Sequence, residues 1–427
     1  MGLFHSRRNR QVGSLAMESG VPLSVEMVPC GLVNVGNTCY INAVLQALYI
    51  CDCIRERVIH GTVSSLHGSR RRGKKKYLWG KKTYPAGSDG LMYSLRDLFV
   101  KMVSQEKQNG FITPRQFVAQ VGKEASRFGD PLEQQDAHEF LDFLINNLDE
   151  QLKKKERMLQ RDIIWTDAPS INDCDDGNGT DDVDGNENSK EGRCSSWVSD
   201  IMEGVMAHDT CCSGCKTVTT STEVFKMLSV EIDDELSVED AIRKFGEVER
   251  MEGDDRFFCD KCNTLCDAER SSRLTKLPRV LLVHLKRFRF DQKSMSRRKM
   301  YDRVPFTSDL LVGNNLLRKR SKPSDKAGEA RGSSSVGYAP VKRVSHENED
   351  GRAYRLSSLV THIGSSPIQG HYVTVANTKS GWMLFDDEDV CEIDEDVVHS
   401  CAGSGKEGSA TDTQVSYILL YVSSDTP

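Results

Sequence analysis

The sequence contains no long apolar run. No hydrophobic stretch approaches the roughly 20 residues that a helix needs to cross a bilayer, and the polar N-terminus lacks the apolar segment of a secretory signal. The net charge of −6 over 427 residues excludes the strongly basic balance that nucleic-acid binding favours. No internal repeat is visible. These absences predict an intracellular protein of the cytoplasm or nucleus, with one large domain or two to three modest ones.

Cysteine, by contrast, is abundant. Fourteen cysteines in a chain without a secretory signal indicate thiols and metal binding rather than disulfides. The segments "CCSGC" and "FCDKC" each contain a CxxC pair, and four thiolates from two such turns form a tetrahedral structural zinc site. Cys211 and Cys266 lie close enough to compete, although the CxxC pairs fit better. The predicted zinc ligands are Cys212, Cys215, Cys259 and Cys262.

Two alternatives to this zinc site remain. One is a set of reduced thiols without a metal, and the other is a nucleic-acid-binding zinc finger. The mixed charge of the two cysteine loops disfavours the second alternative.

The first ten residues, "MGLFHSRRNR", match the N-myristoylation pattern at Gly2. One acyl chain binds membranes only marginally, and the adjacent Arg7, Arg8 and Arg10 are the kind of second signal that it needs. Residues 1–28 are therefore predicted to be a disordered basic tail, with Gly2 as a candidate lipidation site and weak peripheral membrane association as the consequence. The alternative is a basic tail in which the short pattern occurs by chance.

The hydrophobic pattern of the chain changes near its middle. Residues 31–165 are dominated by helix-type periodicity, and residues from 197 onward by the alternation typical of strands. An acidic stretch, about 166–193, separates the two parts and is predicted to be a disordered insertion. A second insertion, about 313–350, is rich in Ser, Gly, Lys and Arg and is predicted to be mobile. The basic stretch 68–90 is interpreted as a solvated loop rather than a nucleic-acid site.

The segment "GLVNVGNTCYINAVLQAL" places one cysteine, Cys39, at the start of a predicted amphipathic helix. Apolar residues recur at i, i+3, i+4 and i+7 from Ile41, which predicts one buried face. Asn37 or Thr38 is expected to cap the first turn. Cys39 would then lie at the positive end of the helix dipole, which favours the thiolate and hence a nucleophile. The alternative is a buried, inert cysteine.

A cysteine nucleophile needs a base, and the base needs an orienting group. The segment "GHYVTVANTKSGWMLFDDEDV" predicts two antiparallel strands that bring His371 beside Asp386. The carboxylate would fix the tautomer of the imidazole, whose other nitrogen would face the thiol. A structural histidine is the alternative.

Several motifs occur in the order found in one protease family. They are "GLVNVGNTCYINAVLQAL", "QQDAHEFLDFLI", the paired CxxC turns, "LPRVLLVHLKRFRFD", "GHYVTVA" with "WMLFDDEDV", and "YILLYV". In these motifs, from about Gly31 to Val422, the chain resembles the ubiquitin-specific proteases, a family of cysteine deubiquitinases. Its short length and few insertions look most like the compact subgroup that is activated by WD-repeat proteins.

The resemblance implies an α+β, papain-like fold that is described as thumb, palm and fingers, in a catalytic domain over residues 29–425. The helical thumb would cover about 31–165. The zinc-clipped fingers would cover about 197–275, and the β-rich palm about 276–425.

The resemblance also implies the roles of individual residues. Cys39 would be the nucleophile, His371 the general base and Asp386 the orienting acid, a role that the adjacent Asp387 is a candidate to share. Asn34 matches the family position whose side-chain amide stabilises the oxyanion. Two residues of "QQDAHEF" are implied to lie at the basic tail of ubiquitin, Asp136 and, beside it, Gln135.

The implied function is hydrolysis of the peptide or isopeptide bond after the C-terminal glycine of ubiquitin, through a thiolate acyl-enzyme. Ubiquitin and ubiquitinated proteins are the implied partners, and structural zinc is the implied cofactor. The alternative is a catalytically weak or inactive ubiquitin-binding scaffold that needs an activating partner, for which a WD-repeat protein is the candidate. A general papain-like peptidase fits the long zinc-bearing fingers less well. A zinc-dependent nucleic-acid binder fits the overall charge less well.

Overall fold

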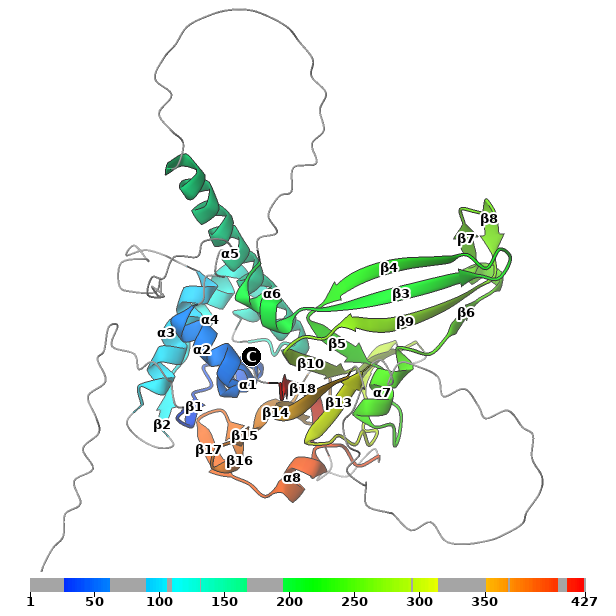
Figure 1. Cartoon of the computed structure of the whole chain (residues 1–427). Helices are drawn as coiled ribbons and strands as arrows, with labels where there is room; N and C mark the ends of the chain where they lie inside the picture. The colour runs from blue at the N-terminus through cyan, green and yellow to red at the C-terminus, as the bar shows by residue number, and fades with distance from the viewer. Residues whose placement is uncertain are drawn as a thin grey trace, which may run out of the picture.

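The computed structural model describes residues 27–61, 90–105, 110–130, 132–166, 195–292, 295–313, 351–367, 369–405 and 413–425. Five predictions concern residues outside these ranges, apart from the outermost residues of each segment. They are the disordered basic tail, lipidation at Gly2, and the states of the basic stretch, the acidic insertion and the second insertion. Figure 1 shows a body of helices and strands from which one narrow sheet projects.

The helical lobe, or thumb, forms where helix-type periodicity was predicted. Its helices are α1 (Cys39–Ile50), α2 (Asp52–His60), α3 (Leu91–Val103), α4 (Arg115–Glu124), α5 (Ala137–Thr166) and α6 (Trp197–Met202). A short 3-10 turn, Ser126–Phe128, follows α4. A parallel pair of short strands, β1 (Cys30–Leu32) and β2 (Gly110–Ile112), lies beside these helices.

Helix α1 differs from its prediction, because all of its residues are buried and not one face only. The helix lies between α5 and the strands β14 and β15, so neighbours cover it on all sides. Its polar side chains have internal partners: Asn42 donates to the Leu32 carbonyl and Gln46 donates to the Cys30 carbonyl. Buried polar groups are tolerated when such hydrogen bonds replace water.

The palm is a single sheet in the order β17-β16-β15-β14-β18-β10-β5, with β13 paired to β14. Neighbours are antiparallel except the parallel pair β10 and β5. The strands are β5 (Met227–Val230), β10 (Val280–Leu285), β13 (Asp309–Gly313), β14 (Gly351–Ile363), β15 (His371–Thr378), β16 (Gly381–Asp386), β17 (Asp389–Glu392) and β18 (Val415–Ser423).

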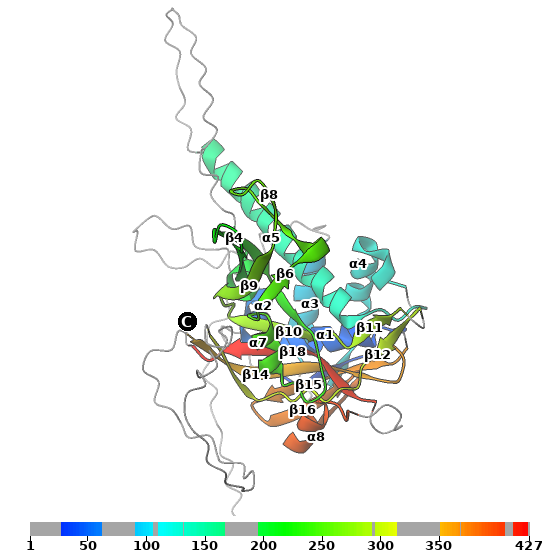
Figure 2. The ribbon, with the colours of Figure 1, turned by 90° about the vertical axis from the view of Figure 1, so that its right-hand side faces the viewer.

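Both faces of the palm sheet are buried at its centre. Ile418 and Leu420 of β18 pack with the thumb helices, whereas Leu419 and Tyr421 between them join a second apolar cluster on the opposite face. Helices α7 (Val238–Lys244) and α8 (Glu395–Ser400) contribute to that second cluster, and Figure 2 shows the thumb and α8 on opposite sides of the sheet. Because successive side chains of a strand point to opposite faces, a strand buried on both faces is largely apolar.

The fingers are a four-stranded sheet in the order β4-β3-β9-β6. It consists of β3 (Gly204–Cys212), β4 (Val218–Phe225), β6 (Glu249–Met251) and β9 (Ala268–Lys276), and it ends at a small hairpin of β7 (Phe257–Cys259) and β8 (Thr264–Cys266). Segment 197–275 is therefore not one unit. Its helix α6 packs on α5 of the thumb, and its strand β5 belongs to the palm sheet.

The thumb–palm–fingers arrangement confirms the predicted α+β, papain-like fold class. A further hairpin, β11 (Phe288–Asp291) and β12 (Ser296–Lys299), extends from the palm after β10. Among the described residues, no helix combines the length and the apolar character that crossing a membrane requires.

Candidate active site and metal centre

Cys39 is the first residue of α1, at the end of a loop that folds around one asparagine. The Oδ1 atom of Asn34 accepts hydrogen bonds from the backbone N–H of Gly36 at 3.0 Å and from the backbone and hydroxyl of Thr38, each at 3.2 Å. Asn37, next to Thr38, adopts a left-handed conformation with φ of 46°. These contacts fix the turn that delivers Cys39, whose exposed fraction is 3%.

The predicted capping of α1 is not what the structure shows at Thr38. Thr38 occupies the N-cap position, but its side chain makes no cap hydrogen bond. Its hydroxyl instead accepts from the backbone N–H of Val35 and donates to Asn34. The side chain of Thr38 therefore stabilises the preceding loop and does not satisfy the N–H groups of the first turn of α1.

Strands β15 and β16 bring His371 and Asp386 together, as their sequence predicted. The Nε2 atom of His371 lies 2.5 Å from Oδ1 of Asp386, and Cys39 is the group with the largest influence on the pKa of the imidazole. Since Nε2 is engaged by the carboxylate, Nδ1 is the nitrogen left to accept the thiol proton. The Cys39 contact raises the pKa of His371 to about 9, burial opposes the shift, and the Asp386 carboxylate adds to it. The structure thus assembles a thiol, an imidazole and a carboxylate.

Asp387 has a different set of contacts from Asp386. Its Oδ2 accepts from Nδ2 of Asn34 at 2.9 Å, and its Oδ1 accepts from Nδ2 of Asn42 at 2.8 Å. The backbone of Leu32 also donates to the carbonyl of Asp387. Asp387 therefore connects the end of β16 to the loop that carries Asn34, and burial raises the pKa of its carboxyl above the usual range.

Glycine is required where β1 meets this turn. A Cβ at Gly31 would collide with the backbone of Glu388, the residue that follows Asp387. Gly31 thus permits a close approach of two backbones that holds Asp387 beside Asn34.

The two predicted ubiquitin-binding residues lie just before α5. Asp136 caps this helix, because its Oδ1 accepts from the backbone N–H groups of His138 and Glu139, and its Oδ2 accepts from the Tyr417 hydroxyl at 2.7 Å. Its carboxylate is therefore fixed between thumb and palm. Gln135, in contrast, makes a 3.4 Å contact with Glu133.

Sequence reasoning missed Gln134, whose side chain reaches the catalytic cysteine. Gln135 and Asp136 form their hydrogen bonds with other residues. The Nε2 atom of Gln134 lies 3.4 Å from the Cys39 sulfur and 2.7 Å from the carbonyl oxygen of Gly370. Its Oε1 accepts from the backbone N–H of Gly370 at 2.9 Å. The motif "QQDAHEF" contains Gln134, but a motif alone does not show which of two adjacent glutamines faces the thiol.

Four cysteines at the far end of the fingers form the candidate metal centre. The sulfur atoms of Cys212 and Cys262 are 3.9 Å apart, and those of Cys215 and Cys259 are 3.5 Å apart. All four lie within 4.8 Å of one another. Four thiolates around one zinc ion at about 2.3 Å lie about 3.8 Å from each other, so this cluster could hold a tetrahedral metal ion.

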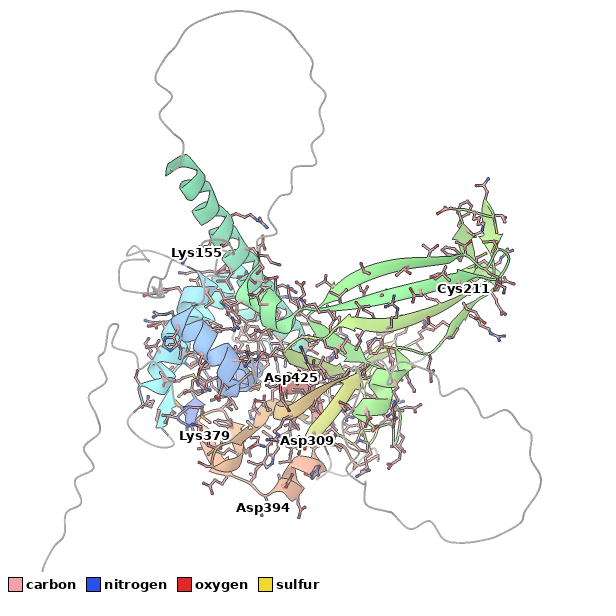
Figure 3. The ribbon with its side chains drawn as sticks, in the orientation of Figure 1. Lys155, Cys211, Asp309, Lys379, Asp394 and Asp425 are labelled. Atoms are coloured by element: carbon pink, nitrogen blue, oxygen red, sulfur yellow. The ribbon has the colours of Figure 1, made fainter. Side chains whose placement is uncertain are left out.

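The cluster consists of the two CxxC pairs and includes neither of the competing thiols. Cys211 lies on β3, where Figure 3 labels it near the outer end of the finger sheet. Cys266 closes β8, next to the cluster but outside it. The pairs join the β3–β4 turn to the β7–β8 hairpin, so a metal ion there would connect two separate hairpins.

His371, Asp386 and Asp387 also lie within 4.8 Å of one another through atoms that could bind a metal. Their contacts argue against such a site. Asp386 is bonded to His371, and both oxygens of Asp387 accept from asparagine amides. The potential ligand atoms are thus hydrogen-bonded to protein groups, and His371 and Asp386 to each other, which is the geometry of a hydrogen-bonded catalytic cluster.

A papain-like fold that carries a thiol, an imidazole and a carboxylate where the thumb meets the palm defines a cysteine hydrolase. The model of the family "Ubiquitin carboxyl-terminal hydrolase" matches residues 30–421. The chain therefore belongs to the ubiquitin carboxyl-terminal hydrolase family, as the resemblance to the ubiquitin-specific proteases predicted, and its enzyme class is thiol-dependent ubiquitin hydrolase.

Curated relatives support this assignment over 92% of the chain. Ubiquitin carboxyl-terminal hydrolase 4 of Arabidopsis thaliana is 32% identical over 397 residues, which span 92% of this chain and 93% of that protein. Ubiquitin carboxyl-terminal hydrolase 12 of Salmo salar is 30% identical over 395 residues, 92% of this chain and 90% of the relative. Ubiquitin carboxyl-terminal hydrolase 46 of Caenorhabditis elegans is 29% identical over 426 residues, 92% and 89% respectively.

The fold is also similar to solved structures. A chain of the SAGA Ubp8/Sgf11/Sus1/Sgf73 DUB module bound to ubiquitin aldehyde superposes with a TM-score of 0.61 at 20% identity, covering 95% of this chain and 72% of that chain. The same module bound to monoubiquitin gives a TM-score of 0.61 at 19% identity, covering 95% and 71%. These similarities concern the fold, and the WD-repeat subgroup stays a prediction.

Proposed function

We propose that the chain is a deubiquitinase in which Cys39 attacks the carbonyl carbon of the C-terminal glycine of ubiquitin. The observation that carries this proposal is the contact of one imidazole, that of His371, with both the Cys39 thiol and the Asp386 carboxylate. The solved relatives with this fold bind ubiquitin aldehyde and monoubiquitin, which supports ubiquitin as the substrate.

The reaction proceeds in two halves. His371 takes the thiol proton through Nδ1, the thiolate adds to the carbonyl carbon, and the resulting oxyanion accepts hydrogen bonds from Nδ2 of Asn34 and from N–H groups at the start of α1. The tetrahedral adduct expels the lysine amine, which receives the proton from His371. A thioester remains on Cys39. His371 then removes a proton from water, which attacks the thioester and releases ubiquitin with a free carboxylate.

Asp386 and Asp387 have separate tasks in this mechanism. Asp386 keeps the imidazole in the tautomer that presents Nδ1 to the thiol and stabilises the imidazolium. Asp387 is a positioning residue that holds the Asn34 amide, since one of the two N–H groups of that amide is bonded to its carboxylate. The second N–H group of Asn34 is the one assigned to the oxyanion.

We also propose that the four-cysteine cluster holds structural zinc. Four thiolates at tetrahedral spacing are the donor set of closed structural zinc sites, which leave no position for substrate or water. Zinc would fix the β7–β8 hairpin to the β3–β4 turn, and the fingers would then present a stable surface to ubiquitin.

The second candidate function is a catalytically weak form that needs an activating partner. Gln134 favours this form, because its side chain contacts both the Cys39 sulfur and the backbone of Gly370. A WD-repeat protein is the predicted activator.

The experiment that tests the proposed function uses ubiquitin with a C-terminal electrophile. Purified wild-type protein should gain the mass of one ubiquitin in intact mass spectrometry, and Cys39→Ala should gain none. Labelling of the Cys39→Ala variant would remove the assigned nucleophile. If neither protein is labelled until an activator is added, the partner-dependent form is the correct reading.

A further inference from the structure

Gly370 lies directly before the catalytic strand β15, outside its ladder. The first paired residue of β15 is His371, which lies opposite Ile363. A Cβ at position 370 would collide with the imidazole of His362, so this ring leaves no space for a side chain at Gly370. Its N–H and C=O groups instead meet the side chain of Gln134, across from β15.

The carboxamide of Gln134 imitates a peptide group in these contacts. It donates to the Gly370 carbonyl at 2.7 Å and accepts from the Gly370 N–H at 2.9 Å. A residue of an antiparallel strand exchanges the same pair of hydrogen bonds with its partner residue. An extended peptide that enters beside β15 can take over both bonds, because recognition by strand addition uses free backbone N–H and C=O groups.

The Gln134 side chain also contacts the nucleophile. Its Nε2 lies 3.4 Å from the Cys39 sulfur, so the same amide that occupies Gly370 covers the thiol. The backbone around Gln134 is anchored, since Asp136 two residues later is bonded to Tyr417 of the palm and caps α5. The side chain can therefore rotate away while the wall that carries it stays in place.

We propose that Gln134 is a gate residue that occupies, in the free enzyme, the hydrogen bonds on Gly370 that the extended C-terminal tail of ubiquitin takes up on binding. This inference rests on the proposed function, because it names the ubiquitin tail as the occupant. Entry of the tail exchanges two intramolecular hydrogen bonds for two intermolecular ones, and the closed side chain lowers the apparent affinity by the fraction of molecules that are open.

The first test measures tail binding without chemistry. Cys39→Ala and Cys39→Ala/Gln134→Ala are titrated with full-length ubiquitin and with ubiquitin that lacks its last glycines. Removal of the gate should tighten binding of full-length ubiquitin by about 30-fold, the effect expected for two hydrogen bonds of ordinary net strength. The truncated ubiquitin should bind both proteins equally. Weaker binding of full-length ubiquitin to the double variant, or equal binding, would overturn the gate.

The second test does not involve ubiquitin. Alkylation of Cys39 by iodoacetamide is followed by intact mass in the wild type, in Gln134→Ala and in Gln116→Ala, whose exposed side chain contacts Lys101 on the thumb. The gate predicts faster alkylation in Gln134→Ala and wild-type rates in Gln116→Ala. An unchanged rate in Gln134→Ala would show that the amide does not cover the thiol.

The two tests separate the gate from the proposed function. Faster alkylation with no binding of either ubiquitin to the Cys39→Ala protein would reject ubiquitin as the substrate and keep the gate over the thiol. Ubiquitin binding that does not depend on residue 134 would keep the proposed function and reject the gate.

Discussion

The Nδ2 atom of Asn34 donates to Oδ2 of Asp387 at 2.9 Å, although 353 positions separate the two residues. This bond joins the loop that delivers the nucleophile to the turn that follows the orienting acid. The same carboxylate is shared with Asn42 of α1, so three segments meet at Asp387. The position of the Asn34 amide, the proposed oxyanion donor, is therefore fixed by the residue that follows palm strand β16.

Replacing Asp387 by alanine should lower kcat and change KM little. Without the carboxylate the Asn34 amide loses its anchor, and a missing oxyanion donor costs about 10²–10³ in kcat, so a displaced one should cost about tenfold or more. The measurement is steady-state cleavage of a fluorogenic ubiquitin conjugate by Asp387→Ala, Asn34→Ala and the double variant. Since the two residues act through one contact, their effects should be less than additive. Fully additive losses would contradict this coupling.

The pH profile should report the His371–Asp386 pair. The pKa of His371 is raised to about 9 by the Cys39 contact and by Asp386, so the imidazolium that protonates the leaving amine is lost as the pH rises through about 9. We expect kcat/KM to fall above that pH, and the falling limb to move to lower pH in Asp386→Asn, which removes one of the causes of the shift. A limb that stays in place in Asp386→Asn would show that the carboxylate does not act on His371.

The raised pKa of His371 also makes the stability of the fold depend on pH. The folded-state pKa of His371 lies above its ordinary value of 6.5, so the stabilising contribution of this group is fully present below pH 6.5 and is lost as the pH rises through about 9. Chemical unfolding of the wild type and of His371→Gln across this window measures it. The difference in unfolding free energy between the two proteins should shrink toward alkaline pH.

The sequence predicts those parts of the site that depend on local pattern. The helix at Cys39 and the strands that carry His371 and Asp386 follow from periodicity over short windows. The role of Gln134 does not follow, because Gly370 is 236 positions away and only the tertiary fold places them together. The full burial of α1 was also missed, since its polar residues Asn42 and Gln46 find internal partners that periodicity does not reveal.

The fingers should depend on their metal ion. Elemental analysis is expected to give one zinc per chain, and Cys215→Ser should lower that content, because one thiolate of the four is lost. Cys211→Ser is the matched control, since Cys211 is adjacent to the cluster in sequence but is not part of it. Loss of zinc in Cys211→Ser with retention in Cys215→Ser would reverse the ligand assignment.

Lys299 is a buried cation whose described partners include backbone carbonyls and an imidazole. With an exposed fraction of 4%, its ammonium group donates to the carbonyl oxygens of Gly364 and Thr413, each at 2.7 Å, and of His362 at 3.1 Å. Nδ1 of His362 lies 2.7 Å from it. Lys299→Met should destabilise the fold by about 3 kcal/mol, because several buried acceptors would lose their donor. Chemical unfolding measures the loss, with the partly exposed Lys286→Met as control.

The pH dependence of that loss tests whether burial lowers the pKa of the Lys299 amine in the folded protein. Burial, with the nearby Arg287 adding to it, lowers the pKa of Lys299 to about 7, whereas the unfolded chain keeps a pKa near the ordinary 10.5. Between these values the unfolded state binds more protons, so this group makes the fold more stable as the pH rises. The difference in unfolding free energy between wild type and Lys299→Met should therefore grow from pH 7 to about 9.5. A difference that stays constant over this range would show that burial does not lower the pKa of Lys299.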